Sequence, residues 1–213
     1  HGAAYAETLT GFKWIANKAI EHDAAGGQFV LGFEEALGYS AGSVARDKDG
    51  VSAALLLADL VSSLKSEGSS LLQYLGELYL RHGFSLSHQK SLRKPGQRGS
   101  AEISAIMGNL RDDPPYRLCG SKIDQIDDLL SGFSFFPESG KNIPIDLPKS
   151  DVLVFKMKGE RIVVRPSGTE PKIKFYFEVR KPLSSLEAQG SVAQQCRERI
   201  DELQEAMLKF AEV

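Results

Sequence analysis

The chain has 213 residues, of which 42% are hydrophobic and 25% are charged, and its formal net charge is −2. These are the values of an ordinary globular protein, and the small net charge excludes a general attraction to nucleic acids or anionic membranes. The length suits one large domain or two small ones, and no run of about 18 apolar residues predicts a membrane-spanning helix.

The two cysteines, Cys119 and Cys196, lie far apart in the sequence, without the spacing of a metal site or of a disulfide framework. A reducing, cytoplasmic location is therefore the default expectation. The first residues, HGAAYAETLTGFKW, contain neither a methionine nor the apolar core of a signal peptide. We therefore expect an internal segment of a longer protein.

The first part of the chain alternates between helical and extended patterns. The spacing of its apolar residues predicts a helix over 10–22, with Thr10 as the N-cap. The apolar run at 29–31 follows two glycines and predicts a short buried strand.

Two amphipathic helices are expected next. The first should begin after an N-cap at Asp47 or Asp49 and stop at Gly68. Its expected apolar stripe consists of Val51, Ala54, Leu55, Ala58 and Val61. The second helix should cover 69–83. The alternation of helix and strand predicts part of a layered α/β domain over 1–83.

The pattern changes at residue 84. The predicted elements are an extended basic stretch over 84–99, a helix over 100–113, two strands around a turn at 158–160, a strand over 172–179 and a helix over 186–213. Apolar and polar residues alternate cleanly in the strand over 172–179. These elements predict an α+β domain over 84–213, in which helices cover one face of a sheet.

The segment IVVRPSGTEPKIKFYFEV places a polar loop between two strand-like runs. Gly168 permits close approach of the backbone, and Ser167 and Thr169 add hydroxyl donors. Arg165 offers a planar pair of donors, and Lys174 adds a charge on the polar face of the next strand. These donors suit a phosphate monoester, but the composition alone fits a simple surface turn equally well.

Three segments resemble the α-D-phosphohexomutase superfamily of phosphoglucomutases, phosphomannomutases and their relatives. RPSGTEPKIKFYFEV resembles the phosphate-binding loop of the C-terminal domain. GFEEALGY, followed by DKDGVSAALLLADLV, resembles the sugar-recognition loop and the next helix of the third domain, and TGFKWIANKAI resembles an earlier loop and helix of that domain. The form GFEEALGY is most similar to the phosphoglucomutase/phosphopentomutase-like branch.

The resemblance implies that residues 1–83 are the C-terminal part of domain 3, with an α/β fold. Residues 84–213 then correspond to domain 4, an α+β domain with a TATA-box-binding-protein-like fold. Members of the superfamily interconvert sugar 1-phosphates and sugar 6- or 5-phosphates through a phosphoserine in domain 1. A sugar bisphosphate is the intermediate and activator, and aspartates of domain 2 hold a Mg²⁺ ion.

No segment of this chain matches the phosphoserine loop or the aspartate-rich metal loop. The DKD at 47–49 is too short and precedes a helix. Because phosphoryl transfer depends on positioning and charge neutralisation, we expect this C-terminal fragment to be inactive alone, with no catalytic or metal-binding residue of its own. Its expected partners are a phosphosugar and the missing N-terminal domains, but neither nucleic acid nor membrane.

Carried over position by position, the resemblance implies three groups of binding residues. The expected phosphate contacts are Arg165, Ser167, Gly168, Thr169 and Lys174. The expected contacts to sugar hydroxyls are Glu34 and Glu35, since a carboxylate accepts from two vicinal hydroxyls. The loop that distinguishes the two binding orientations corresponds to Thr10, Gly11 and Lys13. Ala36 stands where many relatives have serine, which leaves hexose or pentose preference open.

Two other hypotheses belong to different functional classes. The chain could be a non-catalytic phosphosugar-binding module, which upstream serine and aspartate loops in the full gene would rule out. The basic stretch HQKSLRKPGQR could bind nucleic acid. Interleaved aromatic residues are missing from that stretch, which favours a solvated strand edge.

Overall fold

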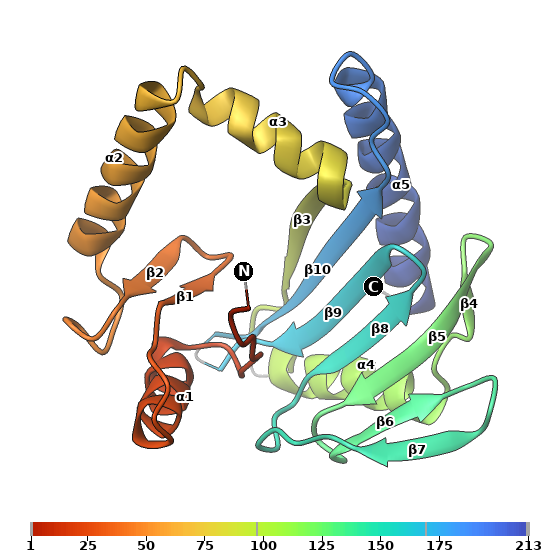
Figure 1. The fold of residues 1–213 in the computed structure, drawn as a ribbon. Helices are drawn as coiled ribbons and strands as arrows, with labels where there is room; N and C mark the ends of the chain where they lie inside the picture. The colour runs from red at the N-terminus through yellow and green to blue at the C-terminus, as the bar shows by residue number, and fades with distance from the viewer. Residues whose placement is uncertain (1, 97, 169, 212–213) are drawn as a thin grey trace. The chain divides into compact units, whose positions relative to one another are not determined.

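The computed structural model (Figure 1) describes residues 2–96, 98–168 and 170–211, and the chain divides into two compact units between Leu75 and Gly76. The first unit is an α/β region, and the second is a sheet-rich α+β domain. The division falls inside helix α3 (Leu71–His82), ahead of the domain boundary expected after residue 83. That domain boundary stays a prediction. None of the helices in the described ranges is long and apolar enough to span a membrane.

The first unit contains two helices and a two-stranded antiparallel hairpin. In chain order these elements are α1 (Phe12–Ala24), β1 (Leu31–Glu34), β2 (Gly38–Ala41) and α2 (Gly50–Ser66). The hairpin packs against α1 so closely that a Cβ added at Gly38 would lie 2.4 Å from the Phe12 ring. A larger residue at position 38 would therefore push the hairpin away from α1.

Two local predictions for this unit were wrong. Helix α1 is capped by Gly11 and not by Thr10, because the Gly11 φ of 121° suits glycine and its N–H donates to the Glu34 carboxylate. The strand expected to be buried at 29–31 instead runs over Leu31–Glu34. Leu31 is 51% exposed and Phe33 is 63% exposed, since the hairpin forms no wider sheet within the described residues.

Helix α2 confirms one local prediction and corrects another. Asp49 is the N-cap, and its carboxylate accepts a hydrogen bond from the Val51 N–H. The expected apolar stripe lies on α2 but is not packed, since Val51 is 82% exposed and Leu55 is 70% exposed. Leu64 is the buried residue of this helix. The first unit thus covers little of the apolar surface of α2.

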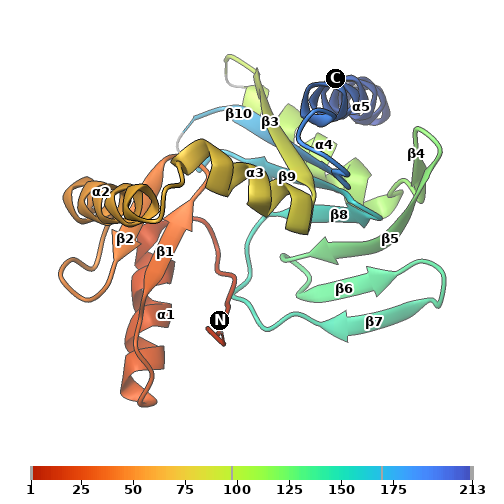
Figure 2. The ribbon, with the colours of Figure 1, turned by 45° about the horizontal axis from the view of Figure 1, so that its top comes forward.

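The second unit is built on an antiparallel sheet with the order β3-β10-β9-β8-β5-β6-β7, and β4 pairs with β5. Its described strands are β3 (Phe84–Arg93), β4 (Arg117–Leu118), β5 (Ser121–Asp128), β6 (Phe133–Phe136), β7 (Lys141–Pro144), β8 (Leu153–Met157), β9 (Glu160–Pro166) and β10 (Lys172–Lys181). Helices α4 (Gly99–Asp112) and α5 (Gln189–Phe210) cover one face of the sheet (Figures 1 and 2).

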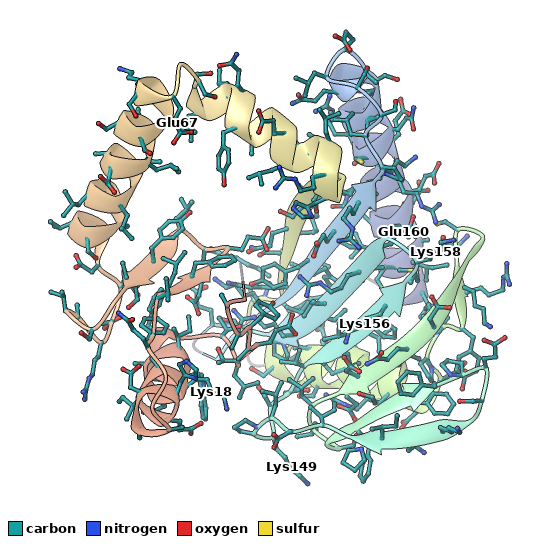
Figure 3. All side chains as sticks on the ribbon, in the orientation of Figure 1. Lys18, Glu67, Lys149, Lys156, Lys158 and Glu160 are labelled. Carbon is teal, nitrogen blue, oxygen red and sulfur yellow. The ribbon has the colours of Figure 1, made fainter. Side chains whose placement is uncertain are left out.

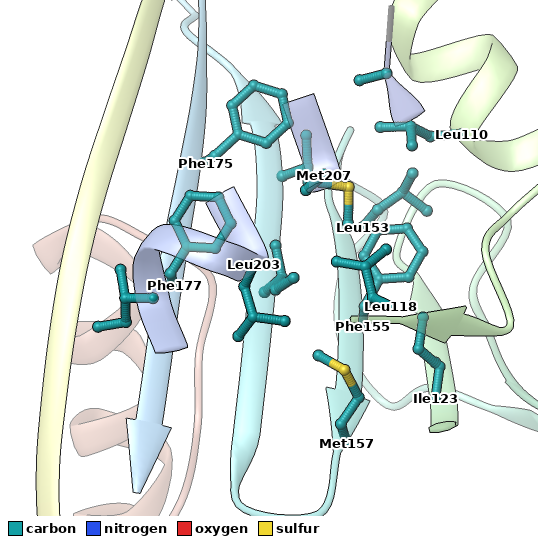
Figure 4. Packing of buried hydrophobic residues seen from close by; sticks show 14 of the residues in the cluster. Leu110, Leu118, Ile123, Leu153, Phe155, Met157, Phe175, Phe177, Leu203 and Met207 are labelled. Carbon is teal, nitrogen blue, oxygen red and sulfur yellow. The ribbon is translucent and has the colours of Figure 1, made fainter. Parts of the chain in front are cut away.

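The core of this unit lies between the sheet and its two helices. The alternation predicted for 172–179 is confirmed, since Phe175 and Phe177 of β10 are fully buried. They lie beside Leu203 and Met207 of α5 (Figure 4). Fully burying side chains of this size stabilises the fold by about 1.5–3 kcal/mol each. Helix α5 therefore holds the central strands in place.

The other face of the sheet is polar. Alternate residues of β10, from Lys172 to Arg180, point away from the core. Lys156 of β8 lies on the same face, directly across from Arg161 of β9 (Figure 3). This face ends at the loop between β9 and β10, where the expected phosphate contacts lie.

Candidate functional site

The loop between β9 and β10 is closed by backbone hydrogen bonds. The Ser167 N–H donates to the Lys172 carbonyl at 2.8 Å, and the Lys172 N–H donates to the Glu170 carbonyl at 2.7 Å. The Ser167 residue is half-buried and Gly168 is exposed. Thr169 lies outside the described residues. The loop is thus a short, internally bonded connection at the end of two paired strands.

Two of the expected phosphate contacts meet at the base of this loop. Arg165 of β9 pairs directly with Lys174 of β10, so both side chains lie on the polar face of the sheet. The Arg165 guanidinium donates a hydrogen bond to the Tyr176 hydroxyl at 3.3 Å and lies 5.8 Å from the Tyr176 ring centre. A cation above an aromatic ring is attracted by its negative face, so Tyr176 orients Arg165 along the sheet.

A carboxylate already lies beside these cations. The Lys172 ammonium is 2.5 Å from the Glu170 carboxylate. This contact is the main reason that the pKa of Glu170 lies below its usual value, and the charges of Arg93 and Lys174 lower it further. The cations at this end of the sheet therefore stabilise the negative charge of this carboxylate.

Lys172, Tyr176 and Arg93 were absent from the candidate site residues predicted from the sequence. The alternation of β10 places Lys172 and Tyr176 on the same face as Lys174, so the sequence pattern holds the signal for both. Arg93 has no such local signal, because its position depends on the pairing of β3 with β10.

In the first unit, two of the expected substrate-binding residues, Gly11 and Glu34, are in contact. The Gly11 N–H donates to the Glu34 carboxylate, which joins the start of α1 to β1. Glu34 is half-buried, whereas Glu35 is exposed in the turn that follows. One oxygen of Glu34 is therefore engaged with the backbone, and the second can accept from a sugar hydroxyl.

The other residues expected near Glu34 lie on the surface. Thr10 and Lys13 are exposed, and the Lys13 ammonium lies 5.0 Å from the Trp14 ring centre. The Lys48 ammonium lies 5.5 Å from the Phe12 ring centre, close to the hairpin. The start of α1 thus supplies one backbone donor and one cation, Lys13, and the segment before α2 supplies a second cation, Lys48.

No group of three or more His, Cys, Asp or Glu side chains in the described residues could hold a metal ion. Three cations, Arg165, Lys172 and Lys174, flank the β9–β10 loop on its two strands, and they repel Mg²⁺, which prefers oxygen ligands. The described residues around this loop therefore do not fit a magnesium site.

Two family models match the chain in order. Phosphoglucomutase/phosphomannomutase alpha/beta/alpha domain III matches residues 1–81, and the phosphoglucomutase/phosphomannomutase C-terminal domain matches residues 102–189.

Curated relatives are similar over most of this chain. A probable phosphomannomutase of Haemophilus influenzae is 40% identical over 176 residues, which are 82% of this chain and 31% of that protein. A probable phosphoribomutase of Schizosaccharomyces pombe is 33% identical over 84% of this chain and 31% of its own length. A phosphopentomutase of Mus musculus is 35% identical over 85% of this chain and 30% of its own length. The chain spans about a third of the length of these relatives.

A solved structure shows the same fold. The open form of the exocytosis-sensitive phosphoprotein pp63/parafusin, a phosphoglucomutase from Paramecium, matches with a TM-score of 0.55 and 18% identity. The match covers 94% of this chain and 33% of that one.

Proposed function

The chain belongs to the phosphoglucomutase/phosphomannomutase family, and we propose that it is the sugar- and phosphate-binding C-terminal part of a phosphosugar mutase. The whole protein would then be an isomerase that moves a phosphoryl group between the C1 hydroxyl and the terminal hydroxyl of a sugar. Relatives named as phosphomannomutase, phosphoglucomutase and phosphopentomutase support a phosphosugar as the substrate class. A cytoplasmic location is part of this proposal.

The observation that carries the proposal is the pairing of Arg165 with Lys174 at the base of the β9–β10 loop. Arg165 offers two parallel donors to phosphate oxygens, Lys174 adds a point charge, and Ser167 adds a hydroxyl. This loop would hold the phosphate that is not reacting. A ligand gripped there keeps its other end free for the phosphoserine of another domain.

Glu34 and Glu35 would bind the sugar hydroxyls, while Thr10, Gly11 and Lys13 would distinguish the two orientations of the substrate. The Glu34 carboxylate is oriented by the Gly11 N–H, which limits its rotation before the sugar arrives. Preorganised groups bind more tightly because less conformational entropy is lost. Thr169 is proposed as a further phosphate contact.

The reacting groups would come from the rest of the protein. Mg²⁺ would neutralise charge on a transferred phosphoryl group when bound, and no cluster of three or more His, Cys, Asp or Glu side chains among the described residues could hold it. In the proposal, the phosphoserine and the metal aspartates lie in the N-terminal domains, which are also the partners of this chain. A sugar bisphosphate would be the intermediate and activator.

A binding titration tests the proposed function. The chain should bind glucose 1-phosphate and not glucose, and Arg165→Ala should weaken phosphosugar binding roughly tenfold or more, since a charge-assisted pair of hydrogen bonds is lost. Arg180→Ala is the matched control, because Arg180 lies at the far end of the same strand. Equal affinity of the chain and of Arg165→Ala for glucose 1-phosphate would contradict the proposal. Alone, the chain should produce no glucose 6-phosphate.

A further inference from the structure

Arg93 is the last residue of the edge strand β3 and pairs directly with Lys172, the first residue of β10. Figure 1 shows β3 beside β10. Directly paired residues in an antiparallel sheet point to the same face. Arg93 therefore shares the polar face with Lys172, Lys174 and Arg165, although more than 70 residues separate it from them in the chain.

The backbone also joins β3 to the β9–β10 loop. The Lys94 N–H, one residue after Arg93, donates to the Pro171 carbonyl at 2.9 Å. This bond continues the β3–β10 pairing past the end of the strand and fixes Arg93 beside the loop. The charge of Arg93 reaches the loop, since it helps to lower the pKa of the Glu170 carboxyl.

Arg93 is an uncommitted cation on this face. Arg161 is paired with Glu178 at 2.6 Å, and Lys156 is paired with Asp127 at 2.8 Å. The Arg93 side chain is exposed, and within the part of the chain that the structure describes its guanidinium makes no ion pair or hydrogen bond. Its donors are therefore free for a ligand at the loop.

We propose that Arg93 is a further phosphate-binding residue, which extends the site from the β9–β10 loop to the end of β3. The inference rests on the proposed function of that loop. Arg93 lies between the residue ranges that the two family models match, so neither model covers it. Because Lys172 is already paired with Glu170, Arg93 supplies an uncompensated positive charge at the outer rim of the loop, and this charge favours the doubly charged form of a phosphate monoester.

The test is a titration of glucose 1-phosphate into the chain, into Arg165→Ala and into three further variants, at low salt and about pH 7.5, where the phosphate monoester is mostly a dianion. Arg93→Gln should weaken binding roughly tenfold, because a charge-assisted contact is lost. Arg93→Lys should recover most of the affinity, since the charge is kept. The matched control is Arg180→Gln, which removes an equally exposed arginine from the opposite end of β10.

The contribution of the Arg93 charge can be tested separately through the pH dependence of phosphate binding. Below about pH 6 the phosphate becomes a monoanion, so the chain should bind it less tightly. Arg93→Gln should show a smaller loss of affinity between about pH 7.5 and pH 5 than the unaltered chain does. Thermal unfolding of each variant checks that the fold is intact.

The possible outcomes separate this inference from the proposed function. If Arg165→Ala weakens binding and Arg93→Gln does not, the loop binds phosphate and the role of Arg93 is wrong. If Arg180→Gln weakens binding as much as Arg93→Gln, the effect is a general one of charge and the inference is also wrong. If neither Arg165→Ala nor Arg93→Gln changes the affinity, or if the chain does not bind, the phosphate site itself is contradicted.

Discussion

At the scale of single residues, the candidate site depends on side chains that are held before a ligand arrives. Arg165 is oriented by the hydroxyl and the ring of Tyr176, and Glu34 is oriented by the Gly11 N–H. In each case, the group that orients the side chain belongs to the same structural unit as that side chain. An arginine with few free rotamers loses less entropy on binding, which favours a site of defined geometry.

The two cysteines provide a test of burial at the same scale. Cys196 has no exposed surface, and burial raises the pKa of its thiol. Cys119 is exposed, but partial burial raises the pKa of its thiol as well, and its S–H donates to the Glu202 carbonyl at 3.3 Å. A raised pKa leaves less thiolate at neutral pH.

In the native protein, a maleimide should therefore label Cys119 and spare Cys196, and unfolding should expose both. Because the pKa of Cys119 is raised, its labelling should be slower at neutral pH than that of a free cysteine and should accelerate beyond the usual thiol pKa of about 8.5. Mass spectrometry of the labelled peptides measures this, with Cys119→Ser as the control. Rapid native labelling of Cys196 would contradict the packing of α5.

At the scale of elements, α5 is joined to the sheet by one polar network as well as by its apolar face. The Arg199 guanidinium donates to the Glu160 carboxylate at 2.6 Å, to the Ser121 hydroxyl at 2.7 Å and to the Cys119 carbonyl at 3.0 Å. Glu160 begins β9 beside the β8–β9 turn (Figure 3). The Glu160 carboxylate raises the pKa of Arg199 above its already high value, so this pair stays charged.

Arg199→Met should lower the free energy of unfolding by about 3 kcal/mol, because it leaves the largely buried Glu160 carboxylate without its cation. The matched control is Arg197→Met on the exposed side of α5. This variant should change the free energy of unfolding by less than about 0.5 kcal/mol. Urea unfolding followed by circular dichroism measures both. Equal stabilities of the two variants would show that the network contributes nothing to the docking of α5.

Local sequence patterns predicted an element correctly where residues close in the sequence determine it. The alternation over 172–179 is confirmed because one face of β10 packs on the core, and the Asp49 cap is confirmed because it needs only the next turn of helix. The prediction of Thr10 as the N-cap was wrong. Gly11 takes that position and donates a hydrogen bond to Glu34, which is distant in the sequence and so left no local signal. The strand at 29–31 was misplaced because short apolar runs do not fix their own boundaries.

The same difference between local and long-range determinants applies to the candidate site. The composition of the β9–β10 loop fitted an anion site and a simple surface turn equally well, whereas the strand period placed Lys174 on the polar face. The sequence could not show that Arg93 lies opposite Lys172, because the order of strands in the sheet is a long-range property. It also did not show that Glu170 pairs with Lys172, which depends on the shape of the loop.

At the scale of the whole molecule, the chain consists of two units that each carry one group of proposed ligand contacts. The first carries Glu34 and Glu35, and the second carries the β9–β10 loop. The chain spans about a third of the length of its curated relatives. Under the proposed function, this chain binds the phosphosugar and other domains of the full protein carry out the chemistry.

The most direct test of phosphate binding at the loop is a nuclear magnetic resonance titration of the isotope-labelled chain with glucose 1-phosphate. The backbone amide signals of Ser167, Lys172 and Lys174 should shift progressively and saturate together, while those of β6 and β7, toward the opposite edge of the sheet, should stay in place. Glucose at the same concentrations should leave all of these signals unchanged. The absence of shifts at Ser167, Lys172 and Lys174, or saturable shifts confined to another surface, would contradict the claim that this loop binds phosphate.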